Sequence, residues 1–170
     1  MSLDTIKRFY RDYNNGHIIY EGNKEVIKRI NRLKPAKVFE FGCGTGKNLN
    51  IVNAEYRMGI DLSIPAITEG KKFYPDIHLL LEDEKFLPII GDKFFDVSFT
   101  VSVFDHISSP HYEIIVEELK RISKNVFVVE SNDIWQPLCF PHDYNAIGFK
   151  TLDYEWVSPA TKAVYKMYKI

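Results

Sequence analysis

Apolar positions along this chain follow two different periods, which alternate from residue 23 to the end. Apolar residues three and four positions apart predict helices over residues 23–33, 64–73 and 112–122, and another helix that begins at 47–52. Short, almost continuous apolar runs predict strands over residues 37–41, 56–60, 77–81, 94–103 and 125–130. Two last runs, 149–156 and 163–170, predict an antiparallel pair of strands. The alternation indicates an α/β fold with a mainly parallel sheet.

The chain carries no mark of a domain boundary. No internal repeat, low-complexity tract or Pro/Gly-rich linker divides the predicted elements. A chain of 170 residues has the size of one domain and is long enough to bury a substantial core. We therefore expect residues 1–170 to form a single domain.

The most informative segment is the glycine-rich turn after the first predicted strand. That strand ends at the carboxylate of Glu40, and Gly42, Gly44 and Gly46 then alternate with small residues before a helical pattern begins. Glycine supplies the positive φ angles and the missing Cβ that allow a ligand to approach the backbone. The helix start favours an anionic group, whereas Glu40 would repel a phosphate. A ligand with both a cationic part and a carboxylate would suit this turn.

Two other glycine motifs compete for the same segment. The dinucleotide fingerprint Gly-x-Gly-x-x-Gly, counted from Gly42, requires a glycine at the position of Lys47. The P-loop requires a Gly-Lys-Ser/Thr sequence after its four-residue gap, and none follows here. A tight turn that binds no ligand is the remaining alternative.

The order acidic-x-Gly-x-Gly-x-Gly, formed here by Glu40 and the three glycines, resembles the first motif of the class I S-adenosylmethionine-dependent methyltransferases. The resemblance extends over most of the chain. It implies a Rossmann-like, doubly wound, seven-stranded and mostly parallel sheet with an antiparallel last strand and helices on both faces. It also implies that residues 1–34 form an N-terminal helical segment over the cofactor, where Tyr10, Tyr13 and Tyr20 would exclude water or simply pack.

The resemblance further implies which residues hold the cofactor. In the family, the acidic residue of the first motif lies near the amino-acid part of S-adenosylmethionine. An acidic residue at the end of the second strand binds the ribose hydroxyls, and an aspartate after the third strand receives the adenine amino group. The matching positions here, with the neighbours that complete them, are Glu40, Gly42, Cys43, Gly44, Gly46, Asp61, Leu62, Asp83 and Glu84.

Each acidic position also has a plain structural interpretation. Glu40 can cap neighbouring backbone groups, and Asp61 can cap the next helix, although Ser63 already suits that role. The acidic run around Asp83 can be a solvated loop, and Glu84 stands where the family has alanine. We favour the cofactor roles because these residues follow the strands at the spacing of the family's motifs.

A second candidate for chemistry follows the fourth strand. The segment Val101–Ile107 resembles the family's fourth motif, which lies beside the transferred methyl group, and it contains Asp105 and His106. His106 is a weak candidate for a general base, and in many relatives this histidine only positions a loop. The catalytic residue therefore stays unassigned. No Asn-Pro-Pro-Tyr or Asp-Pro-Pro-Tyr motif follows this strand, which argues against methylation of a base amine or a glutamine amide.

Composition narrows the class of partner. Apolar residues make up 45% of the chain and the formal net charge is −1, with Lys and Arg scattered, so we expect no nucleic-acid or membrane partner. The chain contains no apolar stretch of membrane-spanning length and no signal-peptide core. Cys43 and Cys139 have no metal-ligand spacing, so we expect no metal and two free thiols in the cytoplasm.

These observations predict methyl transfer from S-adenosylmethionine to a small-molecule acceptor, with S-adenosylhomocysteine as the product. The two alternatives are a nicotinamide (NAD)-dependent oxidoreductase and a cofactor-binding regulatory or scaffold protein without catalytic activity. The sequence leaves open the acceptor atom and the oligomeric state.

Overall fold

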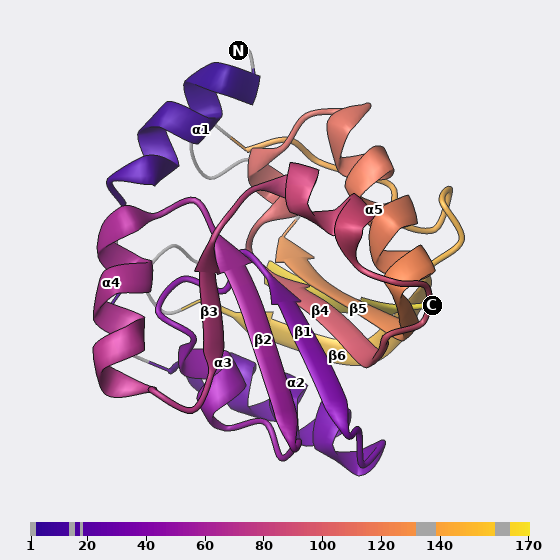
Figure 1. The fold of residues 1–170 in the computed structure, drawn as a ribbon. Coiled ribbons are helices and arrows are strands. Elements are labelled where there is room, and N and C mark those ends of the chain that lie inside the picture. Colours follow the sequence, from indigo (N-terminus) through magenta and orange to yellow (C-terminus); the bar gives the residue numbers. More distant parts are fainter. Residues whose placement is uncertain (1–2, 14–15, 18, 132–138, 159–163) are drawn as a thin grey trace.

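The computed structural model describes residues 3–13, 16–17, 19–131, 139–158 and 164–170. Within these residues, one seven-stranded sheet forms the centre of the molecule (Figure 1). Its strands are β1 Lys37–Phe41, β2 Tyr56–Asp61, β3 His78–Leu81, β4 Phe95–Val101, β5 Ser123–Ser131, β6 Lys150–Val157 and β7 Val164–Lys169. The helices are α1 Leu3–Arg11, α2 Glu21–Arg32, α3 Lys47–Asn50, α4 Ile64–Phe73, η1 Glu84–Ile89, η2 Phe104–His106 and α5 His111–Ile122.

The strand order of the sheet is β3-β2-β1-β4-β5-β7-β6. Strand β1 pairs in parallel with both β2 and β4, so the order reverses between β1 and β4. In sheets of this kind, ligands bind beyond the carboxyl ends of the strands at such a reversal. Strand β7 lies antiparallel between β5 and β6. The predicted fold class, including the antiparallel last strand, is therefore confirmed.

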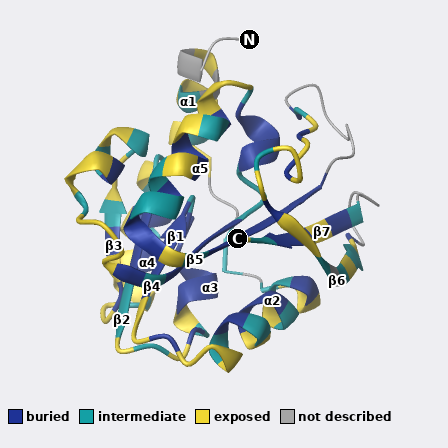
Figure 2. Cartoon of the chain, turned by 90° about the vertical axis from the view of Figure 1, so that its right-hand side faces the viewer, coloured by how far each residue is buried: buried dark blue, intermediate teal, exposed yellow. Residues whose placement is uncertain are grey.

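Two apolar cores lie on opposite faces of the sheet, because successive residues of a strand point to opposite sides. Along β5, Val126 and Val128 belong to the core that α5 covers, whereas Phe127 and Val129 belong to the core under α2, α3 and α4. Figure 2 shows buried residues in the strands and mixed exposure around α2 and α5. None of the described helices combines the length and the apolar composition that crossing a membrane requires.

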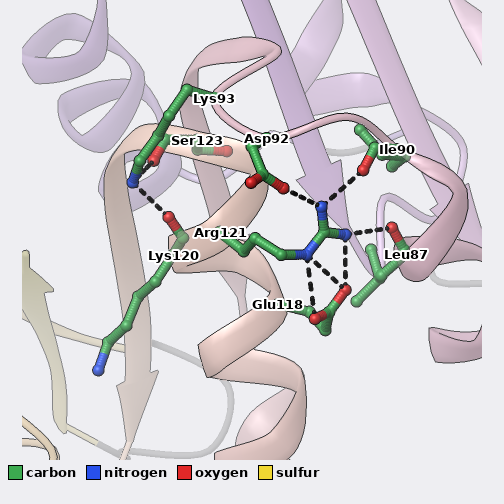
Figure 3. A network of polar contacts seen from close by, with 8 residues as sticks. All are labelled: Leu87, Ile90, Asp92, Lys93, Glu118, Lys120, Arg121 and Ser123. Atoms are coloured by element: carbon green, nitrogen blue, oxygen red, sulfur yellow. Dashed lines mark hydrogen bonds and ion pairs between the residues drawn. The ribbon is translucent and has the colours of Figure 1, made fainter.

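Arg121 joins the end of α5 to the loop before β4, at the end of the sheet opposite the carboxyl ends of the parallel strands (Figure 3). Its guanidinium donates hydrogen bonds to the carbonyls of Leu87 and Ile90 at 3.0 and 2.8 Å, and it pairs with Asp92 and Glu118, each at 2.7 Å. These contacts hold η1 and the start of β4 against α5.

Most predicted elements are present with boundaries shifted by one or two residues, and two differ for physical reasons. Helix α3 is a single turn that ends at Asn50, so the helix start predicted to attract an anion has little dipole to offer. Strand β4 ends at Val101 rather than at 103, because Ser102 adopts a left-handed conformation with φ +57° and turns the chain. The predicted run 163–170 begins outside the described residues.

Candidate active site

A cavity of about 480 Å³ lies beyond the carboxyl ends of β1, β2 and β4, at the reversal of the strand order. The turn after β1, the ends of β2 and β3 and the segment after β4 form its walls. Helix α1 lies above these strand ends (Figure 1) and contributes Lys7, Phe9 and Tyr10 to the lining. This size is typical of a site for a cofactor or small ligand.

The glycine turn allows the backbone to come close both to its neighbours and to the cavity. Gly42 has φ +72°, and a Cβ at this residue would lie 2.4 Å from Cγ2 of Val103. Gly44 has φ +54°, which a side chain would strain. Gly42 and Gly44 line the cavity together with Cys43, whereas Gly46 packs toward Leu79 and does not line it.

Asp61 fastens the glycine turn to the end of β2. Its Oδ2 accepts a hydrogen bond from the Gly44 N–H at 2.7 Å, and its Oδ1 accepts one from the Ser63 N–H at 2.8 Å. Burial raises the pKa of this carboxyl, and these backbone hydrogen bonds oppose the rise. Ser63 itself caps α4 by accepting from the Ala66 N–H at 3.1 Å, so Asp61 is not needed as the helix cap. Asp61 and Leu62 line the cavity, and each carboxylate oxygen can accept a further hydrogen bond.

Glu40 lies one layer behind the cavity wall. Its Oε1 accepts a 2.8 Å hydrogen bond from Nδ2 of Asn48, and Oδ1 of Asn48 accepts a 2.9 Å hydrogen bond from Nδ2 of Asn23. Asn48 and Asn23 line the cavity, whereas Glu40 is 1% exposed and does not. Its Oε2 has no hydrogen-bond partner among the described residues, and burial raises the pKa of Glu40 to about 8. Any contact of Glu40 with a ligand is therefore mediated by a residue of the cavity wall, such as Asn48, or by a shared water.

Lys47, the residue that argued against the dinucleotide fingerprint, is a buried cation in the cavity wall. It is 6% exposed and lines the cavity. Burial lowers the pKa of Lys47, and the charge of Glu40 opposes this shift. Among the residues that the structure describes, Lys47 forms no ion pair within 4.0 Å. A buried ammonium without an ion pair is a binding point for an anionic group.

The acidic segment after β3 is tied to the N-terminal helix. The Nζ of Lys7 lies 2.7 Å from Oδ2 of Asp83 and 2.6 Å from Oε1 of Glu84. Burial opposes the charge of Asp83, but the hydrogen bonds from Lys7 and from the Lys85 N–H hold its pKa below the usual value. Asp83 and Glu84 line the cavity with Lys7, so this acidic run is a partly buried contact rather than a solvated loop.

The segment after β4 turns over the carboxylate of Glu130 at the end of β5. The carboxylate of Glu130 accepts hydrogen bonds from the N–H groups of Val103, at 2.9 and 3.1 Å, and Phe104, at 3.0 Å. Burial, and after it the charge of Asp105, raises the pKa of Glu130 well above its ordinary value. His106 lines the cavity, and its ring centroid lies 4.9 Å from that of Tyr10. Glu130 thus fixes the backbone that presents His106.

The segment after the undescribed residues 132–138 holds the same turn from the other side. The Phe140 N–H donates to the Asp105 carbonyl at 2.6 Å. The Nε2 of His142 lies 2.8 and 2.9 Å from the carbonyls of Phe104 and Ile107, so this nitrogen carries the hydrogen. Burial lowers the pKa of His142, in keeping with a neutral ring that supports the turn.

Sequence reasoning missed several residues of this site. They are Lys7, Asn23, Asn48, Glu130, Tyr154, Trp156 and Tyr165. For Glu130 a signal exists, because it is a carboxylate directly after a buried run, as Glu40 and Asp61 are. The two asparagines, Lys7 and the aromatic side chains of β6 and β7 leave no such signal, since their contacts depend on elements distant in the sequence.

Comparisons with known proteins agree with this geometry. The model of the methyltransferase domain family matches residues 38–125, just over half of the chain. Among solved structures, the methyltransferase domain of bacterial CtHen1 is 14% identical with a TM-score of 0.66, over 86% of this chain and 95% of that one. Magnesium protoporphyrin IX methyltransferase from Synechocystis PCC 6803, with bound S-adenosylmethionine, is 12% identical with a TM-score of 0.62, over 98% and 90%.

The structure of 1,6-didemethyltoxoflavin-N1-methyltransferase from Burkholderia thailandensis is also similar. It is 10% identical with a TM-score of 0.66, over 88% of this chain and 77% of that one. No curated protein matches the sequence. At these identities the solved structures establish the fold, and the match to the family model establishes the family. The chain belongs to the methyltransferase domain family and is a class I S-adenosylmethionine-dependent methyltransferase domain.

Proposed function

We propose that this domain transfers the methyl group of S-adenosylmethionine to a small-molecule acceptor bound beside His106. The observation that carries the proposal is the match between the charges of the cavity wall and those of the cofactor. Lys47 supplies a buried cation directly after the glycine turn, and Glu40 supplies a buried carboxyl whose Oε2 has no hydrogen-bond partner among the described residues. A zwitterionic amino-acid group is the complement of such a pair.

In this proposal, the amino-acid part of the cofactor lies against the turn that follows β1. The α-carboxylate pairs with the ammonium of Lys47. The α-ammonium is held by Asn48, and by Glu40 through Asn48 or a water. Gly42 and Gly44 line this part of the cavity, and Gly44 presents backbone without a side chain to this contact.

The nucleoside part of the cofactor would extend toward β2 and β3. Asp61 keeps acceptor capacity for the two ribose hydroxyls while it holds Gly44 and Ser63. Asp83 would accept the adenine amino group beside Leu62 and Glu84. Since Lys7 pairs with both Asp83 and Glu84, it can stay on Glu84 while Asp83 takes on the ligand.

The chain's own residues then have two tasks in the reaction. The cofactor supplies an electrophilic methyl group on a sulfonium that leaves as a neutral thioether. The protein orients the acceptor in line with that methyl group and keeps water out. Residues 1–34 would serve the second task, because Phe9 and Tyr10 of α1 close over the strand ends.

The cavity lining supports a small, partly apolar substrate. His106, Trp156 and Tyr165 line the cavity, and the chain has no cluster of basic residues in its sequence that would attract a polyanion. The family match leaves the NAD-dependent alternative without support. The non-catalytic alternative makes a different prediction for turnover and is tested by it.

The test is release of S-adenosylhomocysteine from S-adenosylmethionine in the presence of a panel of small hydroxyl, amine, carboxylate and thiol compounds. We expect at least one compound to stimulate release above the acceptor-free rate, and Gly44→Val to abolish the stimulation. Binding of S-adenosylmethionine without stimulation by any class of acceptor would favour the non-catalytic alternative.

A further inference from the structure

Three residues of metal-ligand type meet beside the cavity, although one of them is distant in the sequence from the other two. Asp105 and His106 belong to η2, and Cys139 follows β5 after the undescribed segment. One carboxylate oxygen, one imidazole nitrogen and the thiol sulfur all lie within 4.8 Å of one another. All three residues are buried, with exposures of 1%, 9% and 8%. The cluster therefore differs from a solvated group of surface acids.

The separation of the Asp105 and His106 ligand atoms suits two ligands of one ion. Oδ1 of Asp105 and Nε2 of His106 are 3.4 Å apart. A strong hydrogen bond between such atoms is shorter, at about 2.7–2.9 Å. Two ligands that each lie about 2.0–2.1 Å from a tetrahedral Zn²⁺ are about 3.3–3.4 Å apart. The two atoms already have this separation.

Neighbouring groups hold the ligand-bearing backbone in place. Glu130 binds the N–H groups before Asp105, and the Phe140 N–H binds the carbonyl of Asp105. The second of these contacts brings Cys139 next to η2. His142 fixes the same turn through the carbonyls of Phe104 and Ile107. Metal ligands are usually positioned by an outer layer of hydrogen bonds of this kind.

The local charge also favours a cation. Asp105 and Glu130 bring two carboxyl groups into the interior, where each is 1% exposed. Negative charge in the interior is stabilised by a cation or by a proton. A divalent ion bound by Asp105 would stabilise the charge of this carboxylate.

We propose that Asp105, His106 and Cys139 form a binding site for a divalent transition-metal ion, with Zn²⁺ as the best fit. One oxygen, one nitrogen and one sulfur ligand match the preferences of Zn²⁺, and binding releases the thiol proton of Cys139 to solvent. Three protein ligands leave a fourth position open. Because His106 lines the cavity, an oxygen or nitrogen of an acceptor can reach that position, and this last step alone rests on the proposed function.

The experiment uses the full chain, stripped with a chelator and reloaded with Zn²⁺ or Co²⁺ alone. We expect roughly one ion per chain, a tetrahedral Co²⁺ spectrum and a thiolate-to-Co²⁺ charge-transfer band. Cys139→Ser should remove the band and weaken Zn²⁺ binding at least about tenfold. Cys43→Ser, the matched control for the other thiol, should keep the band and the affinity for Zn²⁺. Asp105→Asn should weaken binding of the ion without removing the band.

Three results would overturn the site: reloaded protein that retains no ion, a Co²⁺ spectrum without the band, or a band that disappears in Cys43→Ser but survives in Cys139→Ser. If Asp105→Asn does not fold, the wild-type spectrum and the two cysteine variants still decide the question. Binding of S-adenosylhomocysteine to the stripped protein is measured in parallel. Its persistence separates failure of the metal site from failure of the proposed function.

Discussion

Asn48 links Glu40 to the cavity: its Nδ2 donates a 2.8 Å hydrogen bond to Oε1 of Glu40, while Glu40 itself is 1% exposed and lies outside the lining. The acidic residue of the glycine motif is thus a buried group that acts through its neighbour. Its environment has a measurable consequence, because burial raises the pKa of Glu40 to about 8.

The first prediction concerns the pH dependence of ligand affinity. A ligand ammonium favours the ionised form of Glu40, so affinity for S-adenosylhomocysteine should rise as pH increases toward 8 and then level off. Lys47 and Asp61 are the charged groups that face Glu40, and Lys47 opposes the pKa shift while Asp61 adds to it. In calorimetry at pH 7, binding of S-adenosylhomocysteine to the wild type should release protons. Binding to the Glu40→Gln variant should release fewer. Equal proton release by both proteins would contradict this role.

The same pKa shift predicts how stability depends on pH. Glu40 binds its proton more tightly in the folded state than in the unfolded state, where its pKa is near the ordinary value of 4.5. Its contribution to stability is therefore fully present below pH 4.5 and is lost as pH rises through about 8. Between these values, the free energy of unfolding of Glu40→Gln should fall less with pH than that of the wild type. Urea unfolding measures both free energies. If they change equally with pH across this range, Glu40 does not titrate in this way.

A further prediction assigns the α-carboxylate of the cofactor to Lys47. Lys47→Met should lower the affinity for S-adenosylhomocysteine by roughly tenfold to a hundredfold, because the charge-assisted hydrogen bond proposed for the α-carboxylate would be lost. Binding of 5′-methylthioadenosine, which has no amino-acid part, should stay within about twofold of wild type. An equal loss for both ligands would mean that Lys47 supports the turn and does not recognise the carboxylate.

Asp61 should affect both the cofactor and the fold. Asp61→Ala should weaken the binding of S-adenosylhomocysteine by roughly tens- to a hundredfold, since the two proposed hydrogen bonds to ribose would be lost. Because Asp61 also accepts from the Gly44 and Ser63 N–H groups, the melting temperature should fall as well. Asp76→Ala, at an exposed aspartate, is the control and should change neither quantity. An unchanged dissociation constant in Asp61→Ala would limit Asp61 to holding the turn.

Lys7 should hold helix α1 in place over the cavity. Lys7→Gln removes the ion pairs with Asp83 and Glu84, so S-adenosylhomocysteine should dissociate faster, and limited proteolysis should cut α1 sooner. The control is Arg8→Gln, because Arg8 lies on the same helix but is exposed. Stopped-flow displacement measures the dissociation rate. Equal rates in both variants would show that the ion pairs do not hold the helix over the ligand.

The sequence predicted the fold well because its signals are local. The buried runs around Phe39, Ile60 and Val128 are bounded by charged or turn residues, which sets strand positions, and the family resemblance supplied the strand order. The glycine turn could also be predicted, since the positive φ angles at Gly42 and Gly44 favour glycine at these positions.

The parts that were not predicted depend on tertiary contacts. Nothing local to Lys7 indicates that it pairs with Asp83, and nothing near Cys139 indicates that it comes to lie beside His106. In the sequence, Lys47 argues only against a dinucleotide motif, because its burial arises from packing around the turn. Contacts of this kind join elements that are distant in the sequence. The local pattern of each element predicts that element alone and does not predict the contact.

Calorimetric titration of the full chain with S-adenosylhomocysteine, and separately with NAD, tests the central claim most directly. The cavity predicts one molecule of S-adenosylhomocysteine bound per chain, no heat with NAD, and loss of binding in Gly44→Val, because the positive φ of Gly44 would strain a valine and the new side chain would compete with the ligand at the cavity wall. Saturable binding of NAD without any response to S-adenosylhomocysteine would contradict the assignment of the cavity.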